Sequence, residues 1–137
     1  MLKRQPHKPQ FTGGLEAALM TPAMASRLKG VKPESLFFAY DTPSDLEPLV
    51  DAGKMLLDAG FTRNSHALRA YVLIGYDKRD TYDKCIKRFG EAYRAGFLPM
   101  AMLYRDKKGD YTKDWKAFQR EWANPVIVPM NCKKHFV

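Results

Sequence analysis

The sequence predicts an α/β fold with a parallel sheet, and three apolar segments are the first evidence for it. Residues 35–40, 69–74 and 97–104 are apolar at successive positions rather than at alternate ones. Strands that are covered on both faces have this composition. Each segment is followed by a stretch with helical periodicity. Alternation of strands and helices with short connections is typical of a parallel sheet with right-handed crossovers.

The helix after the first of these strands is predicted from a capping signal, an apolar stripe and a stop. Ser44 and Glu47 have the spacing of a capping box, in which the two side chains satisfy free backbone amides. Gly60 supplies the stop. The stripe between them has helical spacing and consists of Leu46, Leu49, Val50, Gly53, Leu56 and Leu57.

The next two helices follow the same logic. Asp80 or Thr81 caps the second helix, and Gly96 ends it. Its apolar stripe is formed by Tyr82, Cys85, Ile86, Phe89 and Tyr93. Thr112 caps the third helix, which carries an aromatic face. That face is formed by Trp115, Phe118 and Trp122.

One further strand and helix are expected upstream, with the strand around residues 9–12. Thr21 followed by Pro22 begins the helix, which ends near Gly30. We find no linker inside this order, so the sequence predicts one domain over residues 11–128. A basic tail over residues 1–10 and a second tail over residues 129–137 flank it. Periodicity leaves two architectures open: a small doubly wound sandwich, or a piece of a barrel with helices on one face only.

Composition limits the function classes. The 137 residues are 45% hydrophobic and 28% charged, which is ordinary for a globular domain and argues against disorder. No stretch is long and apolar enough to span a membrane, and no apolar run follows the basic start, so we expect a cytoplasmic protein. The net charge of +8 could hold phosphates. However, the aromatic residues follow helix and strand periodicities, and we therefore do not expect nucleic acid as a partner.

Motifs for metal or nucleophilic chemistry are weak. The sequence has no G-x-G-x-x-G, phosphate loop or G-x-S-x-G. Cys132 and His135 make half a zinc site at best, and Cys85 lies on an apolar stripe as a core residue would. We therefore predict neither a metal ligand nor a catalytic residue.

Polar residues that follow the strands are the best site candidates. Asp41 follows the first long strand, Asp77 and Asp80 follow the second, and Arg105 and Asp106 follow the third. Ligands of parallel α/β proteins commonly bind at this rim. Asp80 is explained by capping and Asp77 by loop solvation, whereas Asp41 and Arg105 are expected to project from one rim.

Four segments resemble the radical S-adenosylmethionine (radical SAM) family. They are residues 11–17 (FTGGLEA), 37–42 (FFAYDT), 71–76 (YVLIGY) and 103–106 (LYRD). In order and spacing they are similar to the later strands of that family's partial six-stranded barrel, over about residues 11–128. The resemblance implies a partial parallel β/α barrel of about four strands, similar to a half-barrel.

The resemblance also implies what is missing. The family holds a 4Fe–4S cluster on a CxxxCxxC loop and binds S-adenosylmethionine in part through a G-G-E segment. Neither motif is present in this chain. By resemblance, Ile74 and Gly75 belong to the segment beside the adenine, Asp41 to a strand end facing ribose or substrate, and Arg105 to the last strand's rim. We therefore expect a truncated or split radical SAM-like protein with no cofactor of its own and no autonomous radical activity.

A half-barrel would expose an apolar face and open sheet edges. The face would be built from Phe37 or Phe38, Tyr71 or Val72, and Met100 or Met102. A patch of this kind is larger than monomers usually tolerate. We expect it to be covered by a second copy of the chain, by a separate N-terminal half-barrel, or by residues 125–137 folding back, and self-association is the leading choice.

Two other functions stay open. One is a module that binds a nucleotide or nucleic acid through the rim and the basic tails. The other is an enzyme of another type, with Asp41 as acid or base and Arg105 as an anion clamp, and it ranks lowest because no nucleophile or histidine is placed at the rim.

Overall fold

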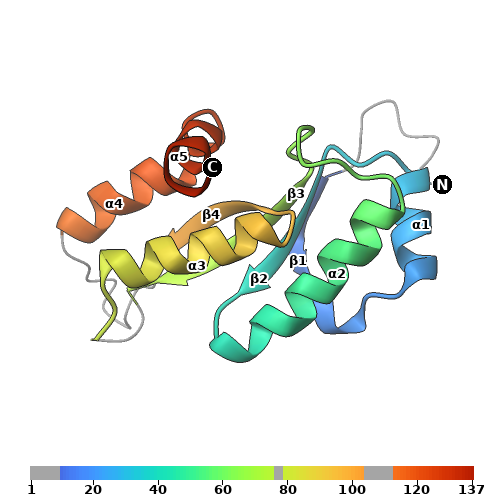
Figure 1. Ribbon diagram of the computed structural model, residues 1–137, viewed down its shortest axis with the longest axis horizontal. Coiled ribbons are helices and arrows are strands. Elements are labelled where there is room, and N and C mark those ends of the chain that lie inside the picture. Colours follow the sequence, from blue (N-terminus) through green and yellow to red (C-terminus); the bar gives the residue numbers. More distant parts are fainter. Residues whose placement is uncertain (1–9, 76–78, 104–112) are drawn as a thin grey trace.

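The computed structural model describes residues 10–75, 79–103 and 113–137 (Figure 1). Strands and helices alternate, which confirms the predicted α/β class. The strands are β1 (Gln10–Leu15), β2 (Ser35–Tyr40), β3 (Leu68–Ile74) and β4 (Leu98–Leu103). The α-helices are α1 (Pro22–Gly30), α2 (Leu46–Asp58), α3 (Tyr82–Arg94), α4 (Lys113–Ala123) and α5 (Val128–Phe136), and two short 3-10 turns are η2 (Ala17–Leu19) and η3 (Pro43–Asp45).

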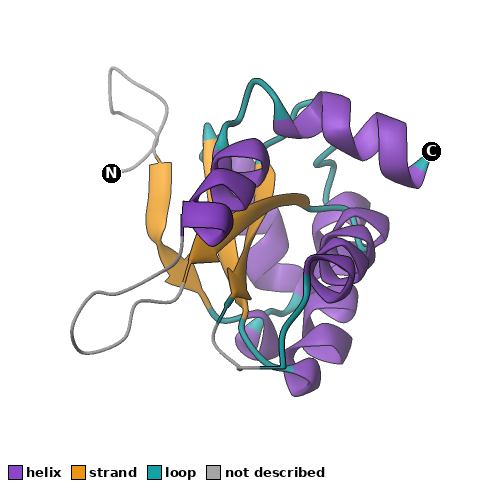
Figure 2. Cartoon of the chain, turned by 90° about the vertical axis from the view of Figure 1, so that its left-hand side faces the viewer, coloured by secondary structure: helices purple, strands orange, loops and turns teal. Residues whose placement is uncertain are grey.

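The sheet runs in chain order, β1-β2-β3-β4, and every pair is parallel. The pairs β2–β3 and β3–β4 are regular, whereas the β1–β2 register shifts between Phe11 and Leu15. Helices α2 and α3 lie over the same face of the sheet, with α1 beside α2 (Figures 1 and 2). A doubly wound sandwich has helices on both faces. Periodicity left open a doubly wound sandwich and a piece of a barrel. The position of α2 and α3 on the same face agrees with the architecture that has helices on one face only.

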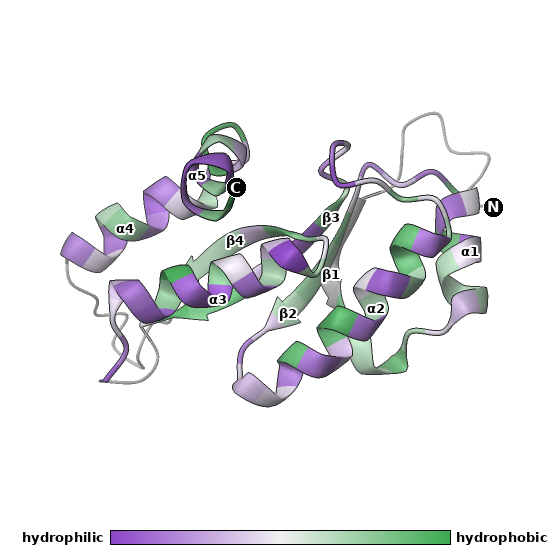
Figure 3. Cartoon of the chain, in the orientation of Figure 1, coloured by the Kyte–Doolittle hydropathy of each residue, from purple (hydrophilic) through white to green (hydrophobic). Residues whose placement is uncertain are grey.

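The two faces of the sheet differ in burial because successive strand residues point to opposite sides. Leu36, Phe38, Val72 and Ile74 are fully buried beneath the helices, and hydrophobic colours dominate the strands in Figure 3. Phe38 meets Phe97 edge to face at 5.2 Å between ring centroids. This helix-covered face is the core of the molecule.

The opposite face of the sheet shows which residue of each predicted pair belongs to the apolar face. It carries Phe37, Tyr71, Met100 and Met102, and Phe37 stacks on Tyr71 with 4.5 Å between ring centroids. Its exposure is uneven: Phe37 and Met100 are buried, Tyr71 is half-buried, and Met102 is 41% exposed. The expectation that all of these residues would be exposed is wrong for Phe37 and Met100.

Helix ends follow the predicted signals at most positions. Gly60 and Gly96 adopt positive φ angles of 115° and 109° just past α2 and α3, which a glycine tolerates without strain. The Thr81 hydroxyl accepts from the Lys84 amide at 3.2 Å and caps α3. Thr112, the expected cap of α4, lies outside the described residues.

The start of α2 differs from the prediction. The Asp45 carboxylate, and not a Ser44–Glu47 box, accepts from the amides of Asp41 and Thr42, both at 3.0 Å. Pro43 begins the short turn η3 one residue before the expected cap, because proline suits the first position of a helical turn. The N-cap is therefore Thr42, two residues before the expected Ser44.

The segment expected as a C-terminal tail is helix α5. Its Val128 and Cys132 are fully buried, and Phe136 packs on Tyr93 of α3 with 5.8 Å between ring centroids. The α3 glycine Gly90 makes room for that ring, since a Cβ built there would lie 3.0 Å from it. Residues 125–137 therefore pack beside α3 in place of an unstructured end.

Aromatic side chains join α3, α4 and α5. Phe89 of α3 stacks on Trp122 at 4.7 Å, and Tyr82 stacks on Phe118 at 4.6 Å between ring centroids. Such pairs add roughly 0.5–1.5 kcal/mol each beyond area burial. The aromatic face predicted for the third helix thus holds α4 against α3.

Candidate functional site

Two groups of polar residues lie at the carboxyl-terminal rim of the sheet, one after β2 and one after β3. Parallel strands present their carboxyl ends at one edge, so both groups share a rim. The first contains Asp41, and the second contains Asp80. The two strands are neighbours in the sheet, with Tyr40 opposite Val72.

The group after β2 lines a groove of about 310 Å³. Asp41 is exposed there, and partial burial together with the neighbouring Asp45 carboxylate raises its pKa above the usual value. Asp45 itself is occupied by the two amides that it caps. The groove is lined by Leu15, Glu16, Ala17, Ala18, Ala39, Asp41, Asp45 and Pro48. It therefore combines small apolar side chains with hydrogen-bond acceptors.

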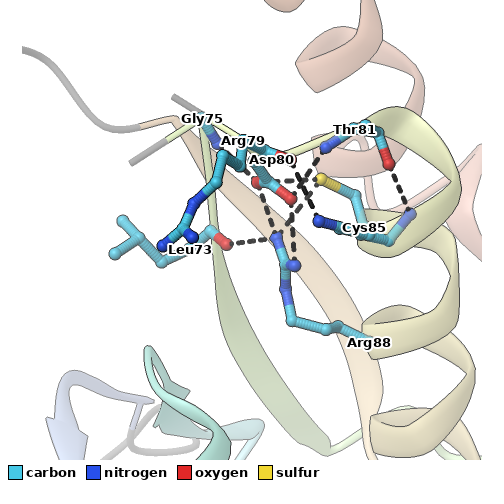
Figure 4. A network of polar contacts seen from close by, with 8 residues as sticks. Leu73, Gly75, Arg79, Asp80, Thr81, Cys85 and Arg88 are labelled. Carbon is cyan, nitrogen blue, oxygen red and sulfur yellow. Dashed lines mark hydrogen bonds and ion pairs between the residues drawn. The ribbon is translucent and has the colours of Figure 1, made fainter. Parts of the chain in front are cut away.

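The group after β3 is a closed hydrogen-bond network around Asp80 (Figure 4). The Arg88 guanidinium donates to both carboxylate oxygens of Asp80, at 2.8 and 3.1 Å, and to the Leu73 carbonyl at 3.0 Å. The amides of Gly75 and Thr81 also donate to Asp80, each at 3.0 Å. Only 6% of the Asp80 side chain is exposed, so this is a nearly buried ion pair.

The electrostatics of Asp80 follow from these contacts. Burial by itself raises the pKa of Asp80, but the hydrogen bonds from Arg88 and Gly75 outweigh it and hold the pKa below its usual value. The Cys85 thiol completes the network, because it donates to Asp80 and accepts from Arg88, both at 3.3 Å. The network therefore links the end of β3 with Asp80, Thr81 and the first turns of α3.

Ile74 and Gly75, the residues expected beside the adenine, lie at the end of β3, and the Gly75 amide donates to Asp80. Ile74 is fully buried with its side chain on the helix-covered face. Gly75 has φ of 71°, and a Cβ added to it would meet Leu103 at 3.2 Å. Arg105, Asp77 and Asp106 lie outside the described residues. The structure thus brings Ile74 and Gly75 next to Asp80, with Asp41 one strand away.

A second polar link connects β2 with α3. The Tyr40 hydroxyl donates to the Glu91 carboxylate at 3.3 Å. Burial and the Glu91 charge raise the pKa of Tyr40 to about 12. This tyrosine therefore stays protonated at any physiological pH and serves as a hydrogen-bond donor.

The thiols are poor nucleophiles and poor metal ligands. Cys85 and Cys132 are both fully buried, and burial raises the pKa of each to about 12. Thiolate is the reactive and ligating form. Among the described residues no group of three His, Cys, Asp or Glu side chains is arranged to hold a metal ion.

Arg88 was missed by the sequence reasoning, which explained Asp80 as a cap alone. The available signal is a charged residue in the middle of a strongly apolar helix stripe, three positions after Cys85 and eight after Asp80. A partly buried arginine is stabilised by an acidic partner. That rule favours a nearby acid at the start of the same helix.

Comparisons with known proteins give no neighbour for this chain: no family model, no curated protein and no solved structure matches it. Within the parts of the chain that the structure describes, none of the helices has the length and apolarity required to cross a bilayer.

Proposed function

We propose that this chain is the later portion of a radical SAM-type barrel that has no 4Fe–4S site of its own and no autonomous radical activity. In this reading it is a half-barrel-like, non-catalytic βα unit that acts only together with a partner surface. The sheet in chain order with α2 and α3 on one face supports the barrel part of the proposal.

The number and burial of the cysteines are the observation that supports the absence of a 4Fe–4S site. Three cysteine thiolates are needed to hold the family's cluster, and the chain contains two. Cys85 is committed to the Asp80–Arg88 network, and Cys132 is buried in α5. These residues therefore do not fit an iron–sulfur cluster.

Anaerobic reconstitution with iron and sulfide tests this proposal. We expect a colourless protein that retains no iron after desalting and forms no 5′-deoxyadenosine from S-adenosylmethionine with a strong reductant. The matched control is the double variant Cys85→Ser, Cys132→Ser, which should behave in the same way. Stoichiometric iron in the parent chain, lost in the double variant, would overturn the proposal.

The groove after β2 favours a second function, the binding of a nucleoside. The carboxylates of Glu16 and Asp41 line this groove together with small apolar side chains. Carboxylates accept hydrogen bonds from ribose hydroxyls and repel phosphates. We therefore expect adenosine to bind in preference to ATP in equilibrium dialysis. Asp41→Asn should weaken adenosine binding while Asp51→Asn, an exposed change on α2, leaves it unaltered. Stronger retention of ATP, or no effect of Asp41→Asn, would exclude this use of the groove.

A further inference from the structure

Helix α5 has one buried side and one exposed apolar side. Val128 and Cys132 are fully buried. Helical spacing places Met130 on the opposite side of the helix from these two residues, and Met130 is 70% exposed. Val126 and Ile127, in the turn that leads into α5, are 77% and 41% exposed. Val126, Ile127 and Met130 together form the outer patch of α5.

The backbone that carries the outer patch is held by hydrogen bonds. The Asn124 side-chain oxygen accepts from the Val126 amide at 2.8 Å, and the Asn124 carbonyl accepts from the Ile127 amide at 3.0 Å. The Asn131 side chain donates to the Glu121 carbonyl of α4 at 2.9 Å. Single exposed apolar residues are ordinary on a protein surface, whereas apolar residues gathered on one ordered turn mark an interaction surface.

The charge next to the outer patch is positive. Residues 124–137 contain no acidic residue. Lys133, Lys134 and His135 follow one another in the last turn of α5, and all three are exposed. The chain as a whole has a net charge of +8. A negatively charged surface is therefore attracted to this side of the molecule.

A basic pocket adjoins α5. Its volume is about 60 Å³, which leaves room for a group of several heavy atoms. Arg63 and His66, from the loop before β3, line it together with Lys133 of α5, and no acidic side chain is among the described residues of its lining. The Arg63 guanidinium donates to the carbonyls of Tyr93 and Arg94 at the end of α3, at 2.5 and 2.7 Å. These two bonds fix the guanidinium in place and use two of its five N–H groups.

The pocket and the outer patch are neighbours on α5. Lys133 lines the pocket and lies three positions after Met130, and residues at that spacing are adjacent on a helix surface. Arginine, lysine and histidine side chains that converge on one point are suited to a phosphate group. One side of α5 therefore combines apolar side chains with a place for a phosphate.

We propose that α5 docks on an anionic phospholipid surface, with the outer patch at the boundary between headgroups and acyl chains and a lipid phosphate in the basic pocket. Surfaces that carry apolar and basic residues side by side bind membranes in this way. Docking through one side of a helix requires no segment that spans the bilayer. The inference goes beyond the function proposed above and does not depend on the radical SAM resemblance.

The composition of this surface favours lipid over a protein partner. Protein interfaces are depleted in lysine and centred on aromatic anchors, whereas the outer patch is aliphatic and followed by Lys133 and Lys134. Three side chains also cover far less than the roughly 800 Å² that each partner buries in a stable protein interface. A membrane requires no such area, because hydrophobic burial and attraction to anionic lipids add to one another.

Vesicle sedimentation tests the proposal. The probes are vesicles of phosphatidylcholine alone and vesicles in which part of this lipid is replaced by phosphatidylglycerol. We expect the parent chain to sediment with the anionic vesicles and to stay in solution with the neutral ones. Salt should release it from the anionic vesicles, since salt screens the attraction between surface charges.

Two variants separate the apolar contribution from the charged one. Met130→Gln should lower binding to the anionic vesicles at least about threefold, because the inserted side chain loses its apolar burial. Lys133→Gln should lower it about fivefold, the usual effect of one lysine near an anionic surface. The matched controls are Met24→Gln on α1 and Lys54→Gln on α2, exposed changes on the far side of the molecule from α5 (Figure 1), and they should bind as the parent does. Circular dichroism checks that each variant is folded.

Four vesicle results would overturn the proposal. They are no binding to anionic vesicles, equal binding to neutral vesicles, anionic binding that Met130→Gln leaves unaltered, and an equal loss from Met24→Gln. The third would mean that charge alone holds the chain, as on any polyanion, and the fourth that apolar residues of α1 make the contact. Inorganic phosphate that stabilises the parent chain against urea, without any vesicle binding, would assign the pocket to a soluble phosphate and exclude the lipid surface.

Discussion

Replacing Arg88 with methionine isolates the contribution of the network after β3. Methionine keeps an unbranched, largely apolar side chain at this position of α3 and removes the guanidinium. The change leaves the Asp80 carboxylate nearly buried with its backbone amides and the Cys85 thiol as remaining partners. The Leu73 carbonyl loses its hydrogen bond from Arg88 as well.

The expected cost follows from the lost contacts. Two hydrogen bonds join Arg88 to Asp80, at 2.8 and 3.1 Å, and a hydrogen bond to a charged group contributes about 1.5–3 kcal/mol. The Arg88 side chain is 23% exposed, so water screens part of this energy. We expect the free energy of unfolding to fall by about 3 kcal/mol, which is large against a typical total of about 5–15 kcal/mol.

The pH dependence gives the sharper test. In the parent chain the lowered pKa of Asp80 stabilises the fold above the unfolded-state pKa of about 3.9, and this stabilisation is lost as pH falls through the folded-state value. Without Arg88 the burial of Asp80 is less compensated, so its folded-state pKa rises and the carboxylate destabilises the fold at neutral pH. The stability difference between parent and variant should therefore be widest at neutral pH and narrow on acidification.

Urea unfolding at a series of pH values measures this difference, with linear extrapolation at each pH. Lys87→Met is the matched control, because Lys87 is the exposed basic residue next to Arg88 on α3. It should change the free energy of unfolding by less than about 0.5 kcal/mol. A difference for Arg88→Met that stays constant with pH, or that matches the control, would refute the assignment of the network as a coupled ion pair.

Two more predictions concern packing and the thiols. Gly53→Ala should destabilise the fold by about 1–3 kcal/mol although alanine has the better helix propensity, because the new Cβ would lie 2.1 Å from the Ala95 carbonyl oxygen. The midpoint of urea unfolding measures this loss, with Lys54→Ala as the control. An unchanged midpoint would contradict the close approach of α2 to the Ala95 carbonyl. Cys85 and Cys132 should react with a thiol reagent at pH 8 only at the rate of global unfolding, since burial raises the pKa of each to about 12; rapid labelling of the native protein would contradict their burial.

The parts of the fold that depend on local chemistry could be predicted from the sequence. The apolar run over residues 35–40 is β2 with the same bounds, and Gly60 and Gly96 end their helices where expected. These features depend on a residue's own conformational preference and on its immediate neighbours. The α/β class follows from them because strands and helices that alternate have few ways to pack.

The parts that depend on distant neighbours could not be predicted. Phe136 packs on Tyr93 of α3, more than 40 positions earlier in the sequence, and Cys132 is fully buried. No local pattern shows these contacts, so the sequence predicts a tail for the last segment. The partner of Arg88 was missed for a related reason. Its guanidinium meets Asp80 because the amides of Gly75 and Thr81 hold that carboxylate beside the first turns of α3, and the periodicity of the helix does not show this contact.

The aromatic cluster between α3 and α4 gives the chain an intrinsic fluorescence signal at one end of the molecule only. Both of its tryptophans, Trp115 and Trp122, lie on α4, where Trp122 is 2% exposed and stacked on Phe89. Intrinsic tryptophan emission should therefore report the docking of α4 on α3, while β1 and α1 contribute no signal. An unfolding curve followed by fluorescence and one followed by circular dichroism will coincide only if both ends of the sheet unfold as one cooperative unit.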